Sequence, residues 1–222
     1  MTHMEVQRWK TNSDLIRAVF EVHVEPKAWA CTKPGPRVLD MTYGRGVWWH
    51  WRHPAYGLQF TAHDIKVDGV DYRHLPEDDL SQDVVAFDPD YIAPGGRKTS
   101  TIPNFNERYG LKKDYETPAT LQQSINDGLS EAYRVLRPQG LILAKTMNYI
   151  SSGKLVLGEY EMIRHGLELG LVVEDIVVHL GDPGPQPKRE SQQKHFRSNS
   201  SRLVIFRRPG RRNKSCQLSA IQ

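Results

Sequence analysis

Three short apolar segments of the chain carry an aspartate at or next to their ends, and this repeated arrangement constrains the fold more than any other feature. The segments are 37–41, 58–64 and 82–88. Short apolar runs bounded by turn residues are typical of strands buried in a parallel sheet. Open α/β sheets bind ligands beyond the carboxyl ends of their strands, so Asp40, Asp64 and Asp88 are predicted to line one site.

Helical patterns alternate with these strands. Helices are predicted at 13–24, 47–51, 117–136 and 159–169, and further strands at 67–72, 141–146, 171–180 and 203–206. The alternation predicts an α/β fold with a Rossmann-like, doubly wound, mostly parallel sheet of seven strands. A loop without a helix separates the last two strands, which predicts one antiparallel strand near the C-terminus.

The chain of 222 residues suits one α/β domain, which we place at residues 1–207. The irregular stretch 92–116 is a candidate substrate-recognition insert, and 208–222 is expected to be a flexible basic tail. No apolar run approaches the ~20 residues that span a bilayer, and the N-terminus lacks a signal-peptide core. The two cysteines are far apart, which indicates neither a disulfide nor a metal site and suits a cytoplasmic protein.

The segment after the first strand contains Gly44-x-Gly46. Glycines here allow a tight turn and a close approach by a ligand, although an ordinary strand-to-helix turn is the alternative. Asp64 lies one βα unit further on, where an acid reaches ribose hydroxyls in nucleotide-binding sheets. Asp71 is a candidate acceptor for an adenine amino group, and a structural role is equally open.

The sharpest motif is Asp88-Pro89-Asp90-Tyr91, directly after an apolar strand. An aromatic amine such as adenine N6 is a poor nucleophile, because its lone pair is delocalised into the ring. The Asp88 carboxylate and the Pro89 backbone carbonyl can each accept a hydrogen bond from one N–H of the amino group. This makes the nitrogen lone pair more reactive and holds it in line for transfer. Tyr91 offers a face on which an extruded base can stack. Alone, the motif is also compatible with a simple Asp-Pro turn.

Taken in order, these motifs resemble the amino-group DNA methyltransferase family, whose members methylate adenine N6 or cytosine N4. The resemblance rests on Val38-Leu39-Asp40-x-x-x-Gly44-x-Gly46, on Asp64, and on 83–91, and it extends to the helix and turn 131–140. It implies S-adenosylmethionine as cofactor, with Asp40, Gly44 and Gly46 at the cofactor, Asp64 at its ribose and Asp71 at its adenine. It also implies catalysis by Asp88, Pro89 and Tyr91. Asp90 departs from the family, which usually has a second proline there.

Three functions follow, of which transfer to a DNA base is preferred. An RNA base methyltransferase, acting at guanine N2 or adenine N6, is the first alternative. A nucleic-acid-binding module on a decayed methyltransferase fold is the second, because of Asp90 and because no large target-recognition segment is present. A homodimer or a separate specificity partner is therefore open, and no membrane partner is expected.

Several other side chains carry two interpretations. Trp48, Trp49 and Trp51 can stack on a ligand, but we expect them to pack a helix onto the sheet. Lys145 can face the site, but a strand-end lysine that extends into solvent is the more common case. The basic residues of the C-terminal part, together with His195, can meet phosphates or belong to a solvated tail. The basic residues are Lys188, Arg189, Lys194, Arg197, Arg202, Arg207, Arg208, Arg211, Arg212 and Lys214.

Overall fold

A six-stranded sheet organises the protein, as seen in the computed structural model, which describes residues 9–24, 34–51, 57–91, 117–180 and 200–210. The strand order is β2-β1-β3-β4-β8-β7. The strands are β1 (Arg37–Asp40), β2 (Gln59–Ala62), β3 (Gln82–Phe87), β4 (Leu136–Thr146), β7 (Val172–Leu180) and β8 (Ser200–Arg207). Neighbours among β2, β1, β3 and β4 are parallel, whereas β8 is antiparallel to both β4 and β7.

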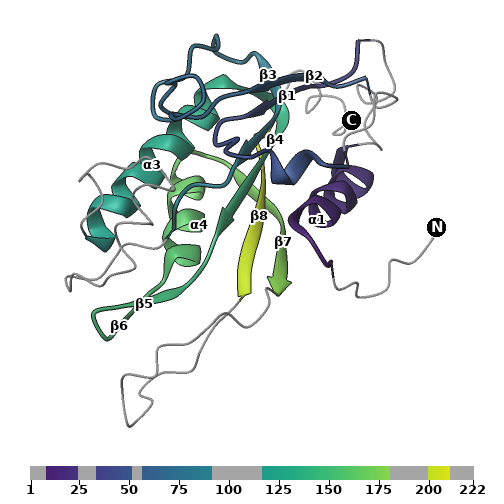
Figure 1. Ribbon diagram of the computed structural model, residues 1–222. Coiled ribbons are helices and arrows are strands. Elements are labelled where there is room, and N and C mark those ends of the chain that lie inside the picture. Colours follow the sequence, from purple (N-terminus) through teal and green to yellow (C-terminus); the bar gives the residue numbers. More distant parts are fainter. Residues whose placement is uncertain (1–8, 25–33, 52–56, 92–116, 181–199, 211–222) are drawn as a thin grey trace, which may run out of the picture.

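Helices cover both faces of this sheet (Figure 1). One face carries α1 (Asn12–Val19), its π-helical continuation η1 (Phe20–Val24) and the 3-10 turn η3 (Val47–Trp49). The other face carries α3 (Pro118–Val135) and α4 (Gly158–Glu168). Two buried apolar clusters result, one under α3 and α4 and one under α1 and η3. The predicted α/β fold class and its single antiparallel strand are therefore confirmed.

The predicted strand at 67–72 is wrong, so the main sheet has six strands among the described residues instead of seven. The chain turns instead, because one carboxylate competes with strand pairing. Oδ1 of Asp68 accepts hydrogen bonds from the backbone N–H groups of Asp64 (3.0 Å) and Val70 (3.2 Å). Such local side-chain bonds are the usual reason that aspartate favours turns.

A small hairpin that the sequence patterns did not predict follows β4. It pairs β5 (Tyr149–Ser151) with β6 (Lys154–Val156). Its two-residue turn places Ser152 and Gly153 at φ of 49° and 77°. Both angles lie in the left-handed region that tight hairpin turns require.

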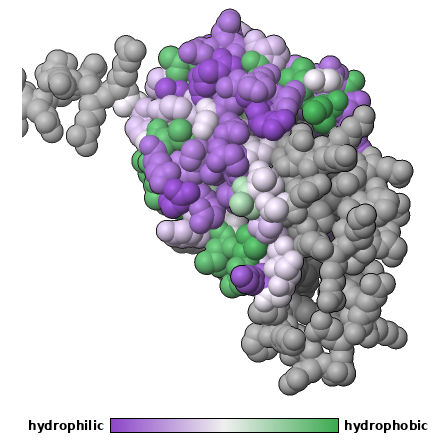
Figure 2. Space-filling model, turned by 90° about the vertical axis from the view of Figure 1, so that its left-hand side faces the viewer, coloured by the Kyte–Doolittle hydropathy of each residue, from purple (hydrophilic) through white to green (hydrophobic). Residues whose placement is uncertain are grey.

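The candidate recognition insert 92–116 lies outside the described residues, as does most of the expected tail. Arg208, the first residue of the expected tail, still pairs with the first part of β4 through its backbone. The Arg208 backbone N–H donates to the Gly140 carbonyl at 3.1 Å, and its carbonyl accepts from Gln139 at 2.8 Å. None of the described helices has both the length and the apolarity that crossing a membrane requires. Where it is coloured, the side that faces the viewer in Figure 2 is mostly hydrophilic, with hydrophobic residues in small separate groups.

Helix α3 packs closely on one face of the sheet. Thr117 caps it through a hydrogen bond from Thr120 N at 3.2 Å, and Pro118 stands at its first turn. Gly128 sits where α3 crosses the aromatic pair of Tyr72 and Phe87, whose ring centroids are 5.3 Å apart. A Cβ at Gly128 would lie 2.7 Å from each ring. The glycine therefore permits the close approach of α3 to the residues that precede Asp88 and follow Asp71.

We expect Gly128→Ala to destabilise the protein by about 1–3 kcal/mol through overpacking, although alanine is the better helix former. Asp127→Ala, at the exposed neighbouring position of the same helix, serves as the control and should change the free energy of unfolding by less than about 0.5 kcal/mol. Urea denaturation followed by circular dichroism measures both. A Gly128→Ala protein at least as stable as the wild type would contradict the close packing described.

Candidate functional site

The segments after β1, β2 and β3 meet at the carboxyl edge of the sheet and are tied together by hydrogen bonds. His63 N donates to the Asp40 carbonyl (2.8 Å), and Tyr43 N donates to the His63 carbonyl (2.9 Å). The third segment joins through Asp88, whose backbone N–H donates to Thr42 Oγ1 at 2.7 Å. The structure therefore brings the predicted residues Asp40, Asp64 and Asp88 to one edge.

Asp40 organises the loop that follows β1. Its carboxylate accepts one hydrogen bond from Thr42 N (2.9 Å) and one from the indole Nε1 of Trp49 (2.6 Å). The side chain is 4% exposed, and this burial raises its pKa to about 7 against the effect of the two hydrogen bonds. Asp40 thus holds the turn and η3 in place from inside. A direct contact with a cofactor, as the sequence predicted, is a proposal.

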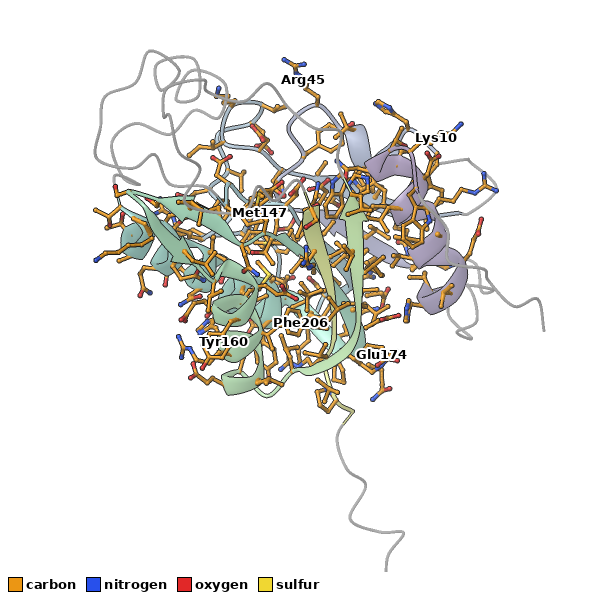
Figure 3. All side chains as sticks on the ribbon, turned by 90° about the horizontal axis from the view of Figure 1, so that it is seen from below. Lys10, Arg45, Met147, Tyr160, Glu174 and Phe206 are labelled. Carbon is orange, nitrogen blue, oxygen red and sulfur yellow. The ribbon has the colours of Figure 1, made fainter. Side chains whose placement is uncertain are left out.

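The two glycines have the backbone that the motif predicted. Gly44 and Gly46 adopt φ of +52° and +67°, which side chains other than glycine rarely tolerate. A Cβ at Gly46 would also lie 2.4 Å from the hydroxyl of Tyr43. Gly44 is exposed, and Arg45 beside it points away from the sheet (Figure 3). The loop therefore presents bare backbone at its rim.

Asp64 links the segment after β2 to the glycine loop. Its Oδ2 accepts from Gly44 N at 3.0 Å, and its Oδ1 accepts from Lys66 N at 2.8 Å. Each oxygen keeps a second lone pair, and the side chain is partly exposed. The carboxylate can therefore accept two further hydrogen bonds from hydroxyl groups at this edge.

His63, which the sequence analysis did not single out, clamps the segment that carries Asp64. Its Nδ1 lies 2.5 Å from Asp68 and its Nε2 lies 2.8 Å from Glu77. Burial disfavours the charged ring, but the hydrogen bonds to both carboxylates outweigh burial and raise its pKa. The hydrogen bond between His63 and Asp68 also lowers the pKa of Asp68 to about 2. A ring with a carboxylate at each nitrogen is best satisfied as the imidazolium.

Asp88 and Pro89 lie where β3 ends. Pro89 is buried, and Asp88 is partly buried with Lys145 Nζ at 3.8 Å from its Oδ2. Burial raises the pKa of Asp88, while Lys145 and the Trp48 indole act in the opposite direction. Tyr91 is partly buried against the cluster under α3, so its ring has a packing contact as well as the predicted stacking role.

Asp90 adds a further acid to this edge. Burial, together with Asp88 and Asp64, raises its pKa to about 7, and only Lys66 opposes them. A proline at this position would carry no such charge. The edge is therefore crowded with carboxyl groups that repel one another as they ionise, which favours a cationic ligand there.

Asp71 precedes Tyr72, whose ring packs on Phe87 at the end of β3, and the carboxylate of Asp71 is already paired. Its carboxylate receives hydrogen bonds from Arg73, including one of 2.6 Å from Nη2, and these lower its pKa against the effect of burial. An adenine contact would have to share this carboxylate with Arg73. The adenine role of Asp71 therefore stays a prediction.

Lys145 corrects one expectation, because it does not extend into solvent. The residue is 5% exposed, and its Nζ donates to Asn12 Oδ1 at 3.0 Å. It lies at the carboxyl end of β4, on the face covered by α1 and η3. Alternation was the available signal: Leu141, Leu143 and Lys145 share one face of the strand, and the two leucines are fully buried.

The tryptophans behave as expected. Trp48 and Trp49 are buried in the cluster under α1, and Trp51 packs against it. The ring of Trp49 lies 4.9 Å from Phe60 and 5.8 Å from Phe20, both in edge-to-face geometry. The indole of Trp49 also bonds Asp40, so its packing and its polar contact set the glycine loop together.

The described arginines of the basic C-terminal part make internal contacts. Arg207 forms a two-pronged ion pair with Glu174, and Arg202 lies 3.5 Å from Glu159. Arg208 donates to the Tyr133 and Leu136 carbonyls, each at 2.7 Å, and lies over the Tyr133 ring. The phosphate-binding interpretation now rests on residues outside the described part, including His195 and Arg197. No cluster of potential metal ligands occurs among the described residues.

Comparison with known proteins gives the fold. No protein-family model matches the sequence, and no curated protein matches it. Among solved structures, a geranyl diphosphate methyltransferase in complex with S-adenosylmethionine shares 13% identity at a TM-score of 0.51, over 88% of this chain and 85% of its own. A putative sarcosine dimethylglycine methyltransferase of Galdieria sulphuraria shares 12% identity at 0.51, over 89% and 85%.

These two structures show that the chain has a methyltransferase fold. A putative DNA modification methylase of Thermus thermophilus is also similar, with 13% identity and a TM-score of 0.43 over 67% of this chain. The chain spans 56% of the length of that protein. At identities this low the likeness concerns the fold, and the substrate has to be argued from the site.

The His63 clamp leads to a prediction about pH. Because the folded pKa of His63 is raised above its ordinary value of 6.5, its stabilisation is present below about pH 6.5 and is lost as pH rises through the folded pKa. We expect His63→Gln to lower the free energy of unfolding by about 2 kcal/mol at acidic pH, and by clearly less at alkaline pH. His50→Gln, at an exposed position, is the control. Urea denaturation over a pH series tests this, and a pH-independent difference would refute the clamp.

The raised pKa of Asp90 gives stability the same direction of pH dependence, but here burial and neighbouring carboxyl groups are the cause. The folded protein binds a proton more tightly than the unfolded chain between about pH 4 and about pH 7, so stability falls as pH rises through that range. We expect Asp90→Asn to be more stable than the wild type by at least about 1 kcal/mol above pH ~7, and to lose that advantage near pH ~4. Asp78→Asn at an exposed site should show no such trend. A stability gain that does not change with pH would argue against a proton on Asp90.

Proposed function

We propose that this protein transfers a methyl group from S-adenosylmethionine to an exocyclic amino group of a nucleic-acid base, with a DNA base as the preferred substrate. The observation that carries the proposal is the bond between Asp88 N and Thr42 Oγ1. It fixes the start of the Asp88–Tyr91 segment directly beside the glycine loop, on a methyltransferase fold. Cofactor and target groups would thus be held by adjacent segments.

The residues present at this edge fit the proposed cofactor. The exposed backbone at Gly44 leaves room for the methionine part, and the partly exposed Asp64 has lone pairs for two ribose hydroxyls. When bound, S-adenosylmethionine supplies an electrophilic methyl group on a positively charged sulfur. The acids Asp40, Asp88 and Asp90 suit that charge. Burial raises their pKa values, carboxyl repulsion adds to this at Asp40 and Asp90, and a nearby cation would favour the ionised carboxylates.

The target amino group is proposed to lie at Asp88 and Pro89. The Asp88 carboxylate and the Pro89 carbonyl accept its two N–H bonds, which directs the nitrogen lone pair toward the methyl group. Once the nitrogen is methylated it carries an extra proton. Asp88, already hydrogen-bonded to that group, can take this proton, and burial makes it a stronger base than an exposed aspartate.

Recognition of the nucleic acid is proposed to involve segments beyond those described, or a second protein, either another copy or a specificity partner. Within the described part, Arg202, Arg207 and Arg208 are engaged in internal contacts. The proposed preference for DNA rests on the order of the sequence motifs. Methyl transfer to RNA is the alternative that the experiment below distinguishes.

The experiment is transfer of labelled methyl groups from S-adenosylmethionine to duplex DNA, single-stranded DNA and total RNA, followed by mass spectrometry of the nucleosides. Labelled N6-methyladenine or N4-methylcytosine in DNA is expected. Label only in RNA would move the protein to the RNA methyltransferases. Cofactor binding without transfer to either polymer would defeat the proposed function and favour a decayed binding module.

Two variants separate catalysis from cofactor binding. Asp88→Ala should abolish transfer while the cofactor Kd changes by less than about threefold, because Asp88 acts on the amino group.

Asp64→Ala should raise the cofactor Kd at least about tenfold through the loss of two hydroxyl hydrogen bonds, and Asp64→Asn should have a smaller effect. Asp78→Ala, at an exposed position, is the control. Isothermal calorimetry and the transfer assay measure both quantities, and full activity of Asp88→Ala would overturn the site assignment.

A further inference from the structure

Lys145 is a buried lysine that lies beside Asp88. Burying an ammonium group is costly unless it is paired, so a lysine that is 5% exposed requires an explanation from its neighbours. Its one hydrogen bond among the described residues goes to Asn12 Oδ1 at 3.0 Å, a neutral acceptor at the start of α1. The carboxylate that can balance its charge is Asp88, at 3.8 Å.

The geometry of the pair leaves Asp88 free to act. A separation of 3.8 Å is too long for a hydrogen bond, so Lys145 contributes its field without occupying an oxygen of Asp88. Asn12 fixes the ammonium at this distance. The Trp48 indole Nε1 also lies near Asp88. It is buried, and among the described residues no acceptor lies within ordinary hydrogen-bond geometry of it. Two buried donors thus lie near Asp88.

Other titratable groups lie around Asp88 and Lys145. Asp40 on β1 and Asp90 in the same segment interact unfavourably with it, as each is affected by the charge of Asp88. Lys66 acts on Asp90, and His179 on β7 faces Lys145. Burial and Lys145 lower the pKa of His179, whose buried Nε2 has no hydrogen-bond partner among the described residues. A neutral histidine there leaves Lys145 as the cation that acts on Asp88.

We propose that Lys145 is a positioning residue for the transfer reaction: fixed by Asn12 at the carboxyl end of β4, its ammonium keeps Asp88 in the ionised form that accepts the hydrogen of the target amino group. This role rests on the function proposed above. It concerns the protonation of Asp88, and it is therefore measurable without any turnover.

The direct test is a pH titration of the Asp88 carboxyl by NMR in protein labelled with carbon-13 at the aspartate side chains, with the signal assigned by its loss in Asp88→Asn. Lys145→Met is expected to raise the titration midpoint of Asp88 by at least about one pH unit, because the charge that favours the carboxylate is gone. Lys145→Arg, which keeps the charge, should stay within about half a unit of the wild type. Lys154→Met, an exposed lysine on β6, should leave the midpoint unchanged.

Kinetics provide the second readout. In Lys145→Met, kcat/KM should fall at least about tenfold below the new Asp88 midpoint and recover above it, with the cofactor Kd unchanged within about twofold. An Asp88 midpoint that does not move in Lys145→Met, or a loss of activity equal at every pH, would overturn the proposal. If Lys145→Met does not fold, Lys145→Gln and Asn12→Ala give the same NMR comparison.

The two proposals fail separately. Absence of methyl transfer by the wild type to DNA and RNA would reject the proposed function, while the NMR titration would still decide the role of Lys145. Conversely, normal transfer with an unmoved Asp88 midpoint in Lys145→Met would reject only the role of Lys145.

Discussion

Like charges at the end of three adjacent parallel strands are the constraint on which the rest of the site depends. Because β2, β1 and β3 are parallel neighbours, Asp64, Asp40 and Asp88 must end at the same edge. Burial of Asp40 and partial burial of Asp64 and Asp88 weaken screening by water, so specific donors offset the repulsion among the three carboxyl groups. Trp49 and Thr42 donate hydrogen bonds to Asp40, and the Gly44 N–H donates to Asp64. Lys145 lies near Asp88. Contacts of this kind hold the glycine loop and η3, and the hydrogen bond from Lys145 to Asn12 ties α1 to the same edge.

The same constraint explains which features were predictable from the sequence. Asp40, Asp64 and Asp88 were located because short apolar runs fix strands, and parallel strands fix where their ends lie. The helix at 117–136 was predictable because Thr117 and Pro118 mark its start, and it was found at Pro118–Val135. The strand at 67–72 was wrong because Asp68 bonds the local backbone, a competition that the apolar pattern does not reveal.

Contacts between distant segments account for what could not be predicted. Lys145 meets an acceptor 133 residues away in sequence, and the burial of its strand end depends on where α1 lies. His63 is likewise defined by Glu77 and Asp68, which reach it only after the segment has turned. The hairpin of β5 and β6 consists of strands of three residues each, too short for an alternating pattern to develop. In each case the residue type was visible, but the partner depended on tertiary structure.

The charges at this edge also suggest why the site would hold a cationic cofactor and a neutral base at the same time. If S-adenosylmethionine binds as proposed, its positive sulfur would offset the charges of Asp40, Asp88 and Asp90. The demethylated product is neutral at sulfur and would not, so these residues would hold the product less tightly than the substrate. Lys145 stays in place through both states. In the proposed reaction it therefore supplies the constant part of the balance at Asp88, and the cofactor supplies the part that changes with each transfer.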